Sequence, residues 1–342
     1  MTSASRRILV VGPSWVGDMV MAQSLFITLR EREPQARIDV LAPAWSLPLL
    51  ARMPEVERGI AMPLGHGEFG WGVRRTLGHS LRDAGYARAI VLPGSLKSAL
   101  VPWFASIPQR TGFRGEMRYG LINDMRPLNK TQLPMTVQRF VSLGQPERQA
   151  SEAAPNVPRP RLQTSPANLQ RLLDVLQIDA ARPAVAMMPG AEYGPAKQWP
   201  LAHFAALASD CVARGEQVWV LGSAKDAPAG EQIVRAAGPG VHNLCGRTEL
   251  ADAVDLIGAA RAAVTNDSGL MHVAAAVGTP VVAIYGSSTP HHTPPLSDRA
   301  TVLYLGLPCS PCFKRECPFG HTRCLQDIAP SQVGDALAAA RA

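Results

Sequence analysis

The sequence predicts an α/β protein made of two doubly wound domains that face each other across a cleft. Short apolar segments of strand length alternate with helix-length segments, which is the pattern of a parallel sheet. Several expected strands end in glycine and polar residues, as they do where ligands bind at the carboxyl edge of such sheets. Residues 155–166 hold four prolines and little apolar content, and this predicted linker divides the series into two halves.

Composition and charge predict a cytosolic protein with an anionic partner. The apolar run at residues 8–11 is too short for a signal peptide, and no stretch reaches the length of a membrane span, so the six cysteines are expected to be reduced. The net charge of +7 suits a phosphorylated sugar, an acidic lipid surface or nucleic acid. Scattered basic residues and an aromatic content of only 6% argue against nucleic acid.

The first half presents a carboxylate where ligands bind. We expect strands at residues 8–11, 38–41 and 89–92, helices at 19–29 and 74–84, and a mobile surface loop at 59–72. The loop after the first strand lacks both the Walker A ending and the G-x-G-x-x-G spacing of a dinucleotide site. It does place Asp18 at the carboxyl edge of that strand. Helix capping and a ligand site are equally open interpretations of this residue.

Four cationic residues follow later strands of the first half. Lys97 stands at an expected helix start, where the helix dipole disfavours a cation, so an anionic ligand explains it better than helix stability does. Arg110, Arg114 and Arg118 lie in or beside the glycine-containing segment 111–118. Exposed arginines are common, so a solvated loop is an equally weighted interpretation of this segment.

The second half repeats the α/β series. We expect strands at residues 184–188, 217–221, 242–244, 262–265 and 280–285, and helices at 168–176, 203–214, 231–237, 250–260, 270–277 and 328–341. Glycine and polar residues follow three of the strands, beginning at Pro189, Gly222 and Thr265. These three strand ends are expected to share one crevice, because the carboxyl ends of parallel strands meet at one edge.

The most informative of these strand ends is the one that begins at Thr265. Asn266, Asp267 and Ser268 all favour helix N-caps, and Gly269 permits close approach of a ligand to the backbone. Free N–H groups and the helix dipole at such a helix start attract an anion, so a phosphorylated ligand is expected. A well-capped helix is the alternative, but Gly269 and His272, one turn on, favour a binding site.

A cysteine cluster lies near the carboxyl terminus. Cys309, Cys312, Cys317 and Cys324 supply the four ligands of a tetrahedral structural zinc site, with His321 among them. Their spacing departs from a zinc ribbon, where two tight pairs are separated by a longer loop. This spacing favours reduced or redox-active thiols, with the structural metal as the alternative.

Three separated segments, residues 12–19, 188–200 and 266–272, resemble glycosyltransferase family 9. The likeness runs in order along nearly the whole chain. It implies a GT-B architecture with an acceptor-binding domain at residues 1–160 and an ADP-heptose-binding domain at 161–327. The helix at 328–342 is then expected to pack back on the first domain. The implied reaction is an inverting transfer that needs no cofactor and no catalytic metal.

The resemblance also implies residue roles. Asp18 corresponds to the proposed catalytic base, and Lys197 stabilises the leaving diphosphate together with the helix start at Asp267. The remaining implied donor-binding residues are Asp226 or Glu231 for the ribose, and Ser268, Gly269 and His272. The acceptor, an anionic lipid, would meet Lys97, Arg110, Arg114 and Arg118.

The implied activity moves L-glycero-D-manno-heptose from ADP-heptose to the first heptose of heptosyl-Kdo2-lipid A. Peripheral contact with the cytoplasmic face of the inner membrane would follow from that acceptor, with no role for nucleic acid. One alternative is another family 9 heptosyltransferase, which adds the first or a later heptose. A second is a non-catalytic protein that binds sugar nucleotides or polyanions, although such a protein needs no carboxylate at position 18. A dehydrogenase is disfavoured by the missing dinucleotide fingerprint.

Overall fold

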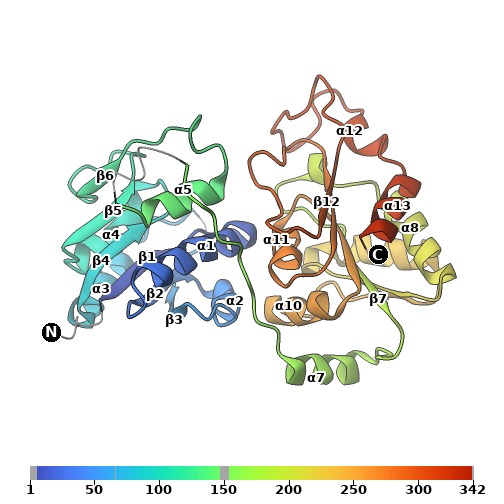
Figure 1. Ribbon diagram of the computed structural model, residues 1–342, viewed down its shortest axis with the longest axis horizontal. Coiled ribbons are helices and arrows are strands. Elements are labelled where there is room, and N and C mark those ends of the chain that lie inside the picture. Colours follow the sequence, from blue (N-terminus) through green and yellow to red (C-terminus); the bar gives the residue numbers. More distant parts are fainter. Residues whose placement is uncertain (1–5, 66, 147–153, 341–342) are drawn as a thin grey trace. The chain divides into compact units, whose positions relative to one another are not determined.

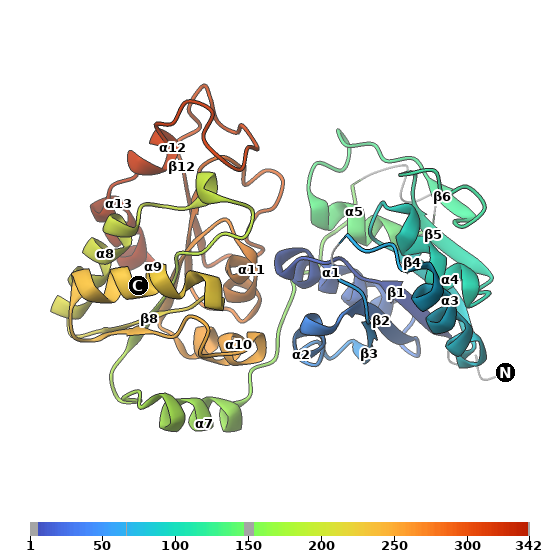
Figure 2. The same cartoon turned by 180° about the vertical axis from the view of Figure 1, so that it is seen from behind.

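A computed structural model describes residues 6–65, 67–146 and 154–340 (Figure 1). The chain divides into two compact units, Met1–Pro160 and Arg161–Ala342. Each unit contains one six-stranded sheet in which all paired strands are parallel (Figure 2). This confirms the predicted fold class of two doubly wound α/β domains. Within the described residues, no helix combines the length and apolar character that crossing a membrane requires.

The sheet of the first unit has the order β3-β2-β1-β4-β5-β6. Its strands are β1 (Arg7–Val11), β2 (Arg37–Pro43), β3 (Val56–Met62), β4 (Tyr86–Val91), β5 (Gln109–Phe113) and β6 (Asp124–Arg126). The helices of this unit are α1 (Val16–Arg32), η1 (Ala44–Ser46), α2 (Leu47–Leu50), α3 (Trp71–Ser80), η2 (Arg82–Ala84), η3 (Leu96–Ala99), α4 (Leu100–Phe104) and α5 (Thr136–Leu143). Helices α1 and α5 pack together, and α3 packs on α4.

The sheet of the second unit has the order β12-β11-β10-β7-β8-β9. Its strands are β7 (Ala184–Met188), β8 (Gln217–Val220), β9 (Val241–Asn243), β10 (Ala262–Asn266), β11 (Val281–Tyr285) and β12 (Ala300–Tyr304). The helices of this unit are α7 (Pro166–Leu176), η4 (Pro195–Lys197), α8 (Leu201–Ala213), η5 (Ala224–Asp226), α9 (Ala227–Ala237), α10 (Leu250–Ala259), α11 (Gly269–Ala276), α12 (Arg323–Gln326) and α13 (Pro330–Ala339).

Strand alternation gives the second sheet two buried faces. Val185 and Met187 of β7 join a core formed with α8, α9 and α13, whereas Ala283 and Tyr285 of β11 face Met271 of α11. Both faces are apolar because a parallel sheet is covered by helices on both sides. Strands β7, β8, β10 and β11 are therefore continuous apolar runs, and they were predicted closely, as was the short strand β9. The edge strand β12 is only partly buried and was not predicted.

The final helix has an apolar face that packs within the second unit. Val333 and Leu337 of α13 are buried in the core of that unit, where the helix packs on α8. The expectation that the segment 328–342 packs on the first domain stays a prediction. The apolar face of α13 is thus used within its own unit.

Two glycine-containing segments of the first unit were predicted as loops, but each begins inside a strand. The segment 59–72, predicted as a mobile loop, begins inside β3, and segment 111–118 begins inside β5. Glycine weakens a strand only modestly, and ladder hydrogen bonds to β2 and β4 offset that cost.

Each sheet has one point where the strand order reverses, and ligands bind at such points in open α/β sheets. In the first unit it lies between β1 and β4, and in the second between β7 and β10. The loops that follow these four strands include the segments 12–18, 92–97, 189–200 and 267–269, where most of the sequence-predicted site residues lie.

Candidate functional site

The reversal point of the second sheet holds a buried ion pair. Lys197, at the end of η4 in the loop after β7, places its Nζ 2.5 Å from Oδ2 of Asp267, which directly follows β10. The Lys197 side chain is 18% exposed and that of Asp267 only 5%. The structure therefore brings together two residues that were both assigned to the donor site, and it directs the Asp267 carboxylate toward the lysine.

Two further residues complete this arrangement, and sequence reasoning missed both. Ser288 Oγ donates to the same Asp267 oxygen at 2.5 Å, and the Lys197 ammonium lies over the Tyr193 ring, 5.3 Å from its centroid. Ser288 belongs to Gly286-Ser287-Ser288, which follows β11. A glycine and polar residues after an apolar strand had marked three other strand ends, so the same signal could have identified Ser288.

Asn266 and Trp199 fix the two loops against each other. The buried Asn266 side chain accepts from the Trp199 backbone N–H at 2.9 Å and donates to the Pro189 carbonyl at 2.6 Å. Trp199 is fully buried, and its indole N–H donates to the Ile328 carbonyl at 2.9 Å. Asn266 thus has a structural role that holds the Lys197 loop beside β10.

The start of α11 provides an anion-binding position next to the ion pair. Ser268 is the N-cap residue, and its side chain makes no capping hydrogen bond with the described residues. The first N–H groups of a helix lack intrahelical acceptors, and here the helix begins with Gly269, which leaves space near the backbone. Such N–H groups bind a phosphate well.

His272 lies behind this helix start rather than at its surface. It is 5% exposed, and burial lowers its pKa from 6.5 to about 4, with the Lys197 charge acting in the same direction and Asp267 opposing it. The imidazole is therefore neutral near pH 7 and adds no charge beside the ion pair. The structure gives it a buried position, where we had expected a donor-binding residue.

The two candidates for ribose binding make protein contacts. Asp226 Oδ2 accepts from the N–H and the hydroxyl of Ser223, both at 2.8 Å, and so stabilises the turn after β8. A Cβ atom on Gly190 would lie 2.5 Å from Asp226 Oδ1, so this carboxylate packs against the loop after β7. Glu231 accepts from the Asn243 side chain at 2.8 Å.

In the first unit, Asp18 lies where the candidate base was expected. It is a partly exposed residue in the first turn of α1, just after the carboxyl end of β1. The N-cap position belongs to Trp15, so Asp18 is not the N-cap residue. A carboxylate in a first helical turn is favoured by the dipole, and this position also lies at the reversal point of the sheet.

Three of the four predicted acceptor-binding cations are at least partly exposed. Arg114 is exposed, whereas Lys97 and Arg110 are partly exposed, and Lys97 Nζ is 3.3 Å from the Glu68 carbonyl. Arg118 is instead fully buried and donates to the carbonyls of Pro93 at 2.7 Å and Phe113 at 2.5 Å. Its guanidinium joins the loops after β4 and β5, so the prediction that Arg118 meets the acceptor is wrong.

The Arg110 guanidinium is also engaged in hydrogen bonds within the protein. Its guanidinium donates to the carbonyls of Ile107 at 2.5 Å, Leu121 at 2.6 Å and Gly120 at 3.3 Å. Five N–H donors in a fixed plane make arginine suited to collecting several backbone carbonyls. Arg110 therefore orders the chain on either side of β5, where we had expected it to bind the acceptor.

The cysteine cluster is not arranged as a metal site among the described residues. Burial raises the pKa of Cys324, and the charges of Cys309, Cys312 and Cys317 raise it further, so the four thiols influence one another. Backbone N–H groups around Cys317 lower the pKa of that thiol. Among the described residues, however, no three His, Cys, Asp or Glu side chains are arranged to hold a metal ion. All six cysteines lie among the described residues as free thiols.

Comparison with known proteins identifies the family. Residues 74–323 match glycosyltransferase family 9 (heptosyltransferase). Lipopolysaccharide heptosyltransferase 2 of Salmonella typhimurium and that of Escherichia coli K12 are each 50% identical to this chain over 97% of both chains. The solved structure of E. coli ADP-heptose lps heptosyltransferase II superposes with a TM-score of 0.88 at 48% identity, covering 98% of each chain. By sequence over most of its length and by fold, this chain belongs to glycosyltransferase family 9.

Proposed function

We propose that the chain is an inverting heptosyltransferase that moves L-glycero-D-manno-heptose from ADP-heptose to the first heptose of heptosyl-Kdo2-lipid A. The observation that carries this proposal is the 50% identity, over 97% of both chains, with two proteins named lipopolysaccharide heptosyltransferase 2. The first unit would hold the acceptor and the second the donor. The reaction would take place at the cytoplasmic face of the inner membrane, where the lipid-linked acceptor is anchored.

Inversion requires a single displacement at the anomeric carbon of the donor. A hydroxyl oxygen of the acceptor forms the new bond to that carbon while the bond to the ADP oxygen breaks, and ADP departs with the bonding electrons. The acceptor proton passes to Asp18, which lies partly exposed beside the carboxyl end of β1. A positioned carboxylate within hydrogen-bond reach of the hydroxyl can act as this general base.

The leaving diphosphate gains negative charge as the bond breaks, and the second unit offers it fixed partners. Lys197 supplies a cation that Asp267 and Tyr193 hold in place. The N–H groups at the start of α11 supply dipoles that need no rearrangement, and Ser268 and Gly269 border them. The Lys197–Asp267 pair is neutral overall, so it attracts the diphosphate less than an unpaired lysine would. The N–H groups therefore contribute a larger share of the attraction.

On the acceptor side, Lys97 and Arg114 are the two cations that we propose to meet the anionic inner core. Both follow strands of the first sheet: Lys97 lies in η3, after β4, and Arg114 directly follows β5. Arg110 and Arg118 support these loops from within.

The test is a transfer assay with two matched acceptors. Purified protein is incubated with ADP-heptose and either heptosyl-Kdo2-lipid A or Kdo2-lipid A, with and without EDTA. We expect ADP release and a mass increase of one heptose only with the heptosylated acceptor, and the same rate in EDTA. Transfer to Kdo2-lipid A alone would identify a first-heptose enzyme instead. Loss of activity in EDTA that Mg²⁺ restores would contradict leaving-group stabilisation by Lys197 and α11.

A further inference from the structure

Three large aromatic side chains lie half-exposed beside one another on the first unit. Phe69, Trp71 and Trp103 expose 49%, 49% and 41% of their surface. Trp71 and Trp103 contact the Phe104 ring with centroids 5.1 Å and 4.9 Å away, and Phe69 stacks on Trp71 at 6.2 Å. Single exposed apolar residues are ordinary, but a contiguous group marks an interaction surface. We call these four residues the aromatic cluster.

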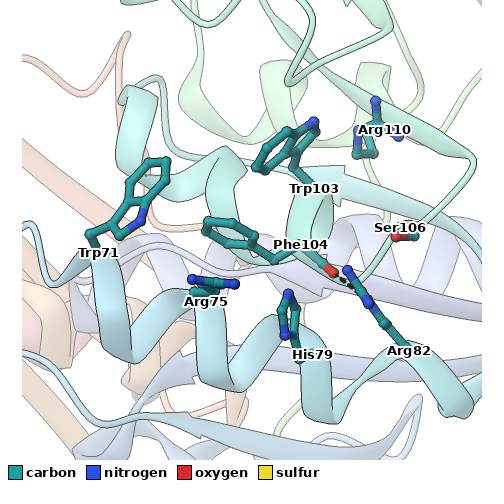
Figure 3. Close-up of a pocket in the computed structure, with 8 residues that line it drawn as sticks. All are labelled: Trp71, Arg75, His79, Arg82, Trp103, Phe104, Ser106 and Arg110. Carbon is teal, nitrogen blue, oxygen red and sulfur yellow. Dashed lines mark hydrogen bonds between the residues drawn. The ribbon is translucent and has the colours of Figure 1, made fainter.

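A pocket of about 670 Å³ opens between this cluster and a group of cations (Figure 3). Its lining includes Arg75, Arg82 and Arg110 together with Trp71 and Trp103, and none of its described lining residues is a carboxylate. In Figure 3, Arg75 and His79 of α3 project toward the Phe104 ring, and Arg82 extends beside them. The pocket thus combines large rings with uncompensated positive charge.

Two of these arginines are anchored by hydrogen bonds to backbone carbonyls. Arg82 Nε donates to the Phe104 carbonyl at 2.9 Å, and Arg110 donates to backbone carbonyls. In the part of the chain that the structure describes, none of the three forms an ion pair. Desolvation lowers the pKa of His79, and the charges of Arg82 and Arg75 lower it further. The potential at this pocket is therefore positive.

Helices α3 and α4, which carry Trp71, Arg75 and Trp103, pack closely against each other. A Cβ atom on Gly78 of α3 would lie 2.4 Å from the Phe104 Cβ and 2.8 Å from the Val101 carbonyl oxygen of α4. Glycine at this position lets the two helices meet. Trp71 and Arg75 on α3 and Trp103 on α4 are consequently held beside one another by this close helix contact.

We infer that the aromatic cluster and these three arginines form a docking surface for an anionic phospholipid bilayer. Tryptophan rings have an apolar body and a polar N–H group, so they are stable at the level of lipid head groups. Arginine side chains beside them bind lipid phosphates. The inference rests on the proposed function in one respect: an acceptor anchored by lipid A brings the enzyme against such a bilayer. Single-stranded nucleic acid also attracts rings and arginines, but nothing in that function supplies it.

The test is vesicle sedimentation without donor or acceptor. Vesicles of phosphatidylethanolamine and phosphatidylglycerol are compared with vesicles of phosphatidylcholine alone. We expect the intact protein to sediment with the anionic vesicles only. Arg75→Ala should lower the partition coefficient about fivefold, because one basic residue near an anionic surface contributes about 1 kcal/mol. Trp71→Ala combined with Trp103→Ala should lower it about tenfold or more, since apolar area is no longer buried.

Matched variants separate this surface from general charge and exposure. Trp45→Ala removes a tryptophan that is also 41% exposed, and Lys130→Ala removes an exposed cation of the same unit. Neither should change vesicle binding, and Arg75→Lys should retain most of it. Thermal unfolding of each variant checks that the fold is intact.

Several results would overturn the inference. These are equal sedimentation of the double tryptophan variant and the intact protein, binding that appears only when lipid A is added, or binding of an oligonucleotide in place of vesicles. The assay contains neither substrate, so its outcome is independent of the transfer assay. Transfer to a deacylated, water-soluble acceptor should be unchanged in the Arg75 and tryptophan variants, which separates failure of docking from failure of the proposed function.

Discussion

At the residue scale, Asp267 accepts hydrogen bonds from both Lys197 and Ser288 beside the start of α11. A buried carboxylate that loses its cation is costly, whereas replacing both members of a pair is often tolerated. The same residues can therefore be tested separately for folding and for donor binding.

Lys197→Ala should lower the free energy of unfolding by roughly 3–5 kcal/mol, because it leaves the Asp267 carboxylate buried and unpaired. The double variant Lys197→Met/Asp267→Asn should regain most of that stability. Both variants should bind ADP more weakly than the intact protein. Urea unfolding and calorimetric titration with ADP measure the two effects.

The exposed pair Lys225–Glu192 provides the control, with side chains 78% and 58% exposed. Lys225→Ala should leave the free energy of unfolding nearly unchanged, because solvent screens an exposed ion pair. If the Lys197 double variant bound ADP as well as the intact protein, Lys197 would have only a structural role.

Asp18→Asn should lower kcat by roughly 10²–10⁴-fold, the usual contribution of a positioned general base. The amide keeps the size of the side chain and cannot take the acceptor proton, so the affinity for ADP-heptose should change little. Steady-state kinetics with both substrates measures this. A variant with nearly unchanged turnover would remove Asp18 from the mechanism.

His272 should make the folded state sensitive to mild acid. Its pKa falls from 6.5 to about 4 on burial, so in the range between these values the unfolded chain binds a proton that the native protein does not. The stability that neutral His272 contributes is complete above pH 6.5 and is lost as the pH falls toward 4. In His272→Gln, the decline of the unfolding free energy over this range should be less steep. Urea titrations at several pH values give the comparison, and parallel curves for both proteins would contradict it.

At the element scale, the loops after β4 and β5 are joined by one side chain. Arg118 donates to the Pro93 and Phe113 carbonyls, and its NH1 group lies 3.3 Å from the Ser98 hydroxyl. Lys97 lies in the first of these loops, so its position depends on this buried arginine.

Arg118→Met should lower the free energy of unfolding strongly, because several buried acceptors lose their donor. Each unsatisfied buried polar group costs roughly 1–3 kcal/mol, and several are created here. The KM for the acceptor should rise through disorder of the Lys97 loop. Arg114→Met, a change at an exposed position, should raise the KM without loss of stability. Thermal unfolding and acceptor titration distinguish the two. Unchanged stability in Arg118→Met would restore its predicted contact with the acceptor.

At the scale of the whole molecule, each unit has its own parallel sheet and its own buried core. The described residues of the second unit bury Val185, Phe204 and Ile284 in one cluster together with α13. Every strand of its sheet pairs within the unit. A unit with a complete core of this size can fold alone.

Residues 161–342 expressed alone should therefore fold and bind ADP with an affinity close to that of the intact protein, but without transferring heptose. Circular dichroism and calorimetric titration measure folding and binding. Lys197→Ala in the same fragment should weaken ADP binding. A folded fragment that does not bind ADP would show that the donor site needs the first unit.

The sequence determined the fold class and the place of the candidate site. Continuous apolar runs such as residues 184–188 predict buried parallel strands, and polar residues at their carboxyl ends mark the ligand-binding edge. Asp18, Lys197 and Asp267 were identified in this way and through family resemblance. These are local signals, which the order of residue types along the chain carries directly.

Only the tertiary structure decided which charges are available to a ligand. Arg114 and Arg118 lie four positions apart in the same segment, yet one is exposed and the other fully buried. The acceptor that holds Arg118 is the Pro93 carbonyl, 25 positions away. In the same way, Lys197 meets Asp267 across 70 positions, and β3 and β5 form in glycine-containing segments because neighbouring strands supply their hydrogen bonds. Such pairings join residues that are distant in the sequence and become neighbours only in the folded chain. Local residue patterns therefore do not predict them.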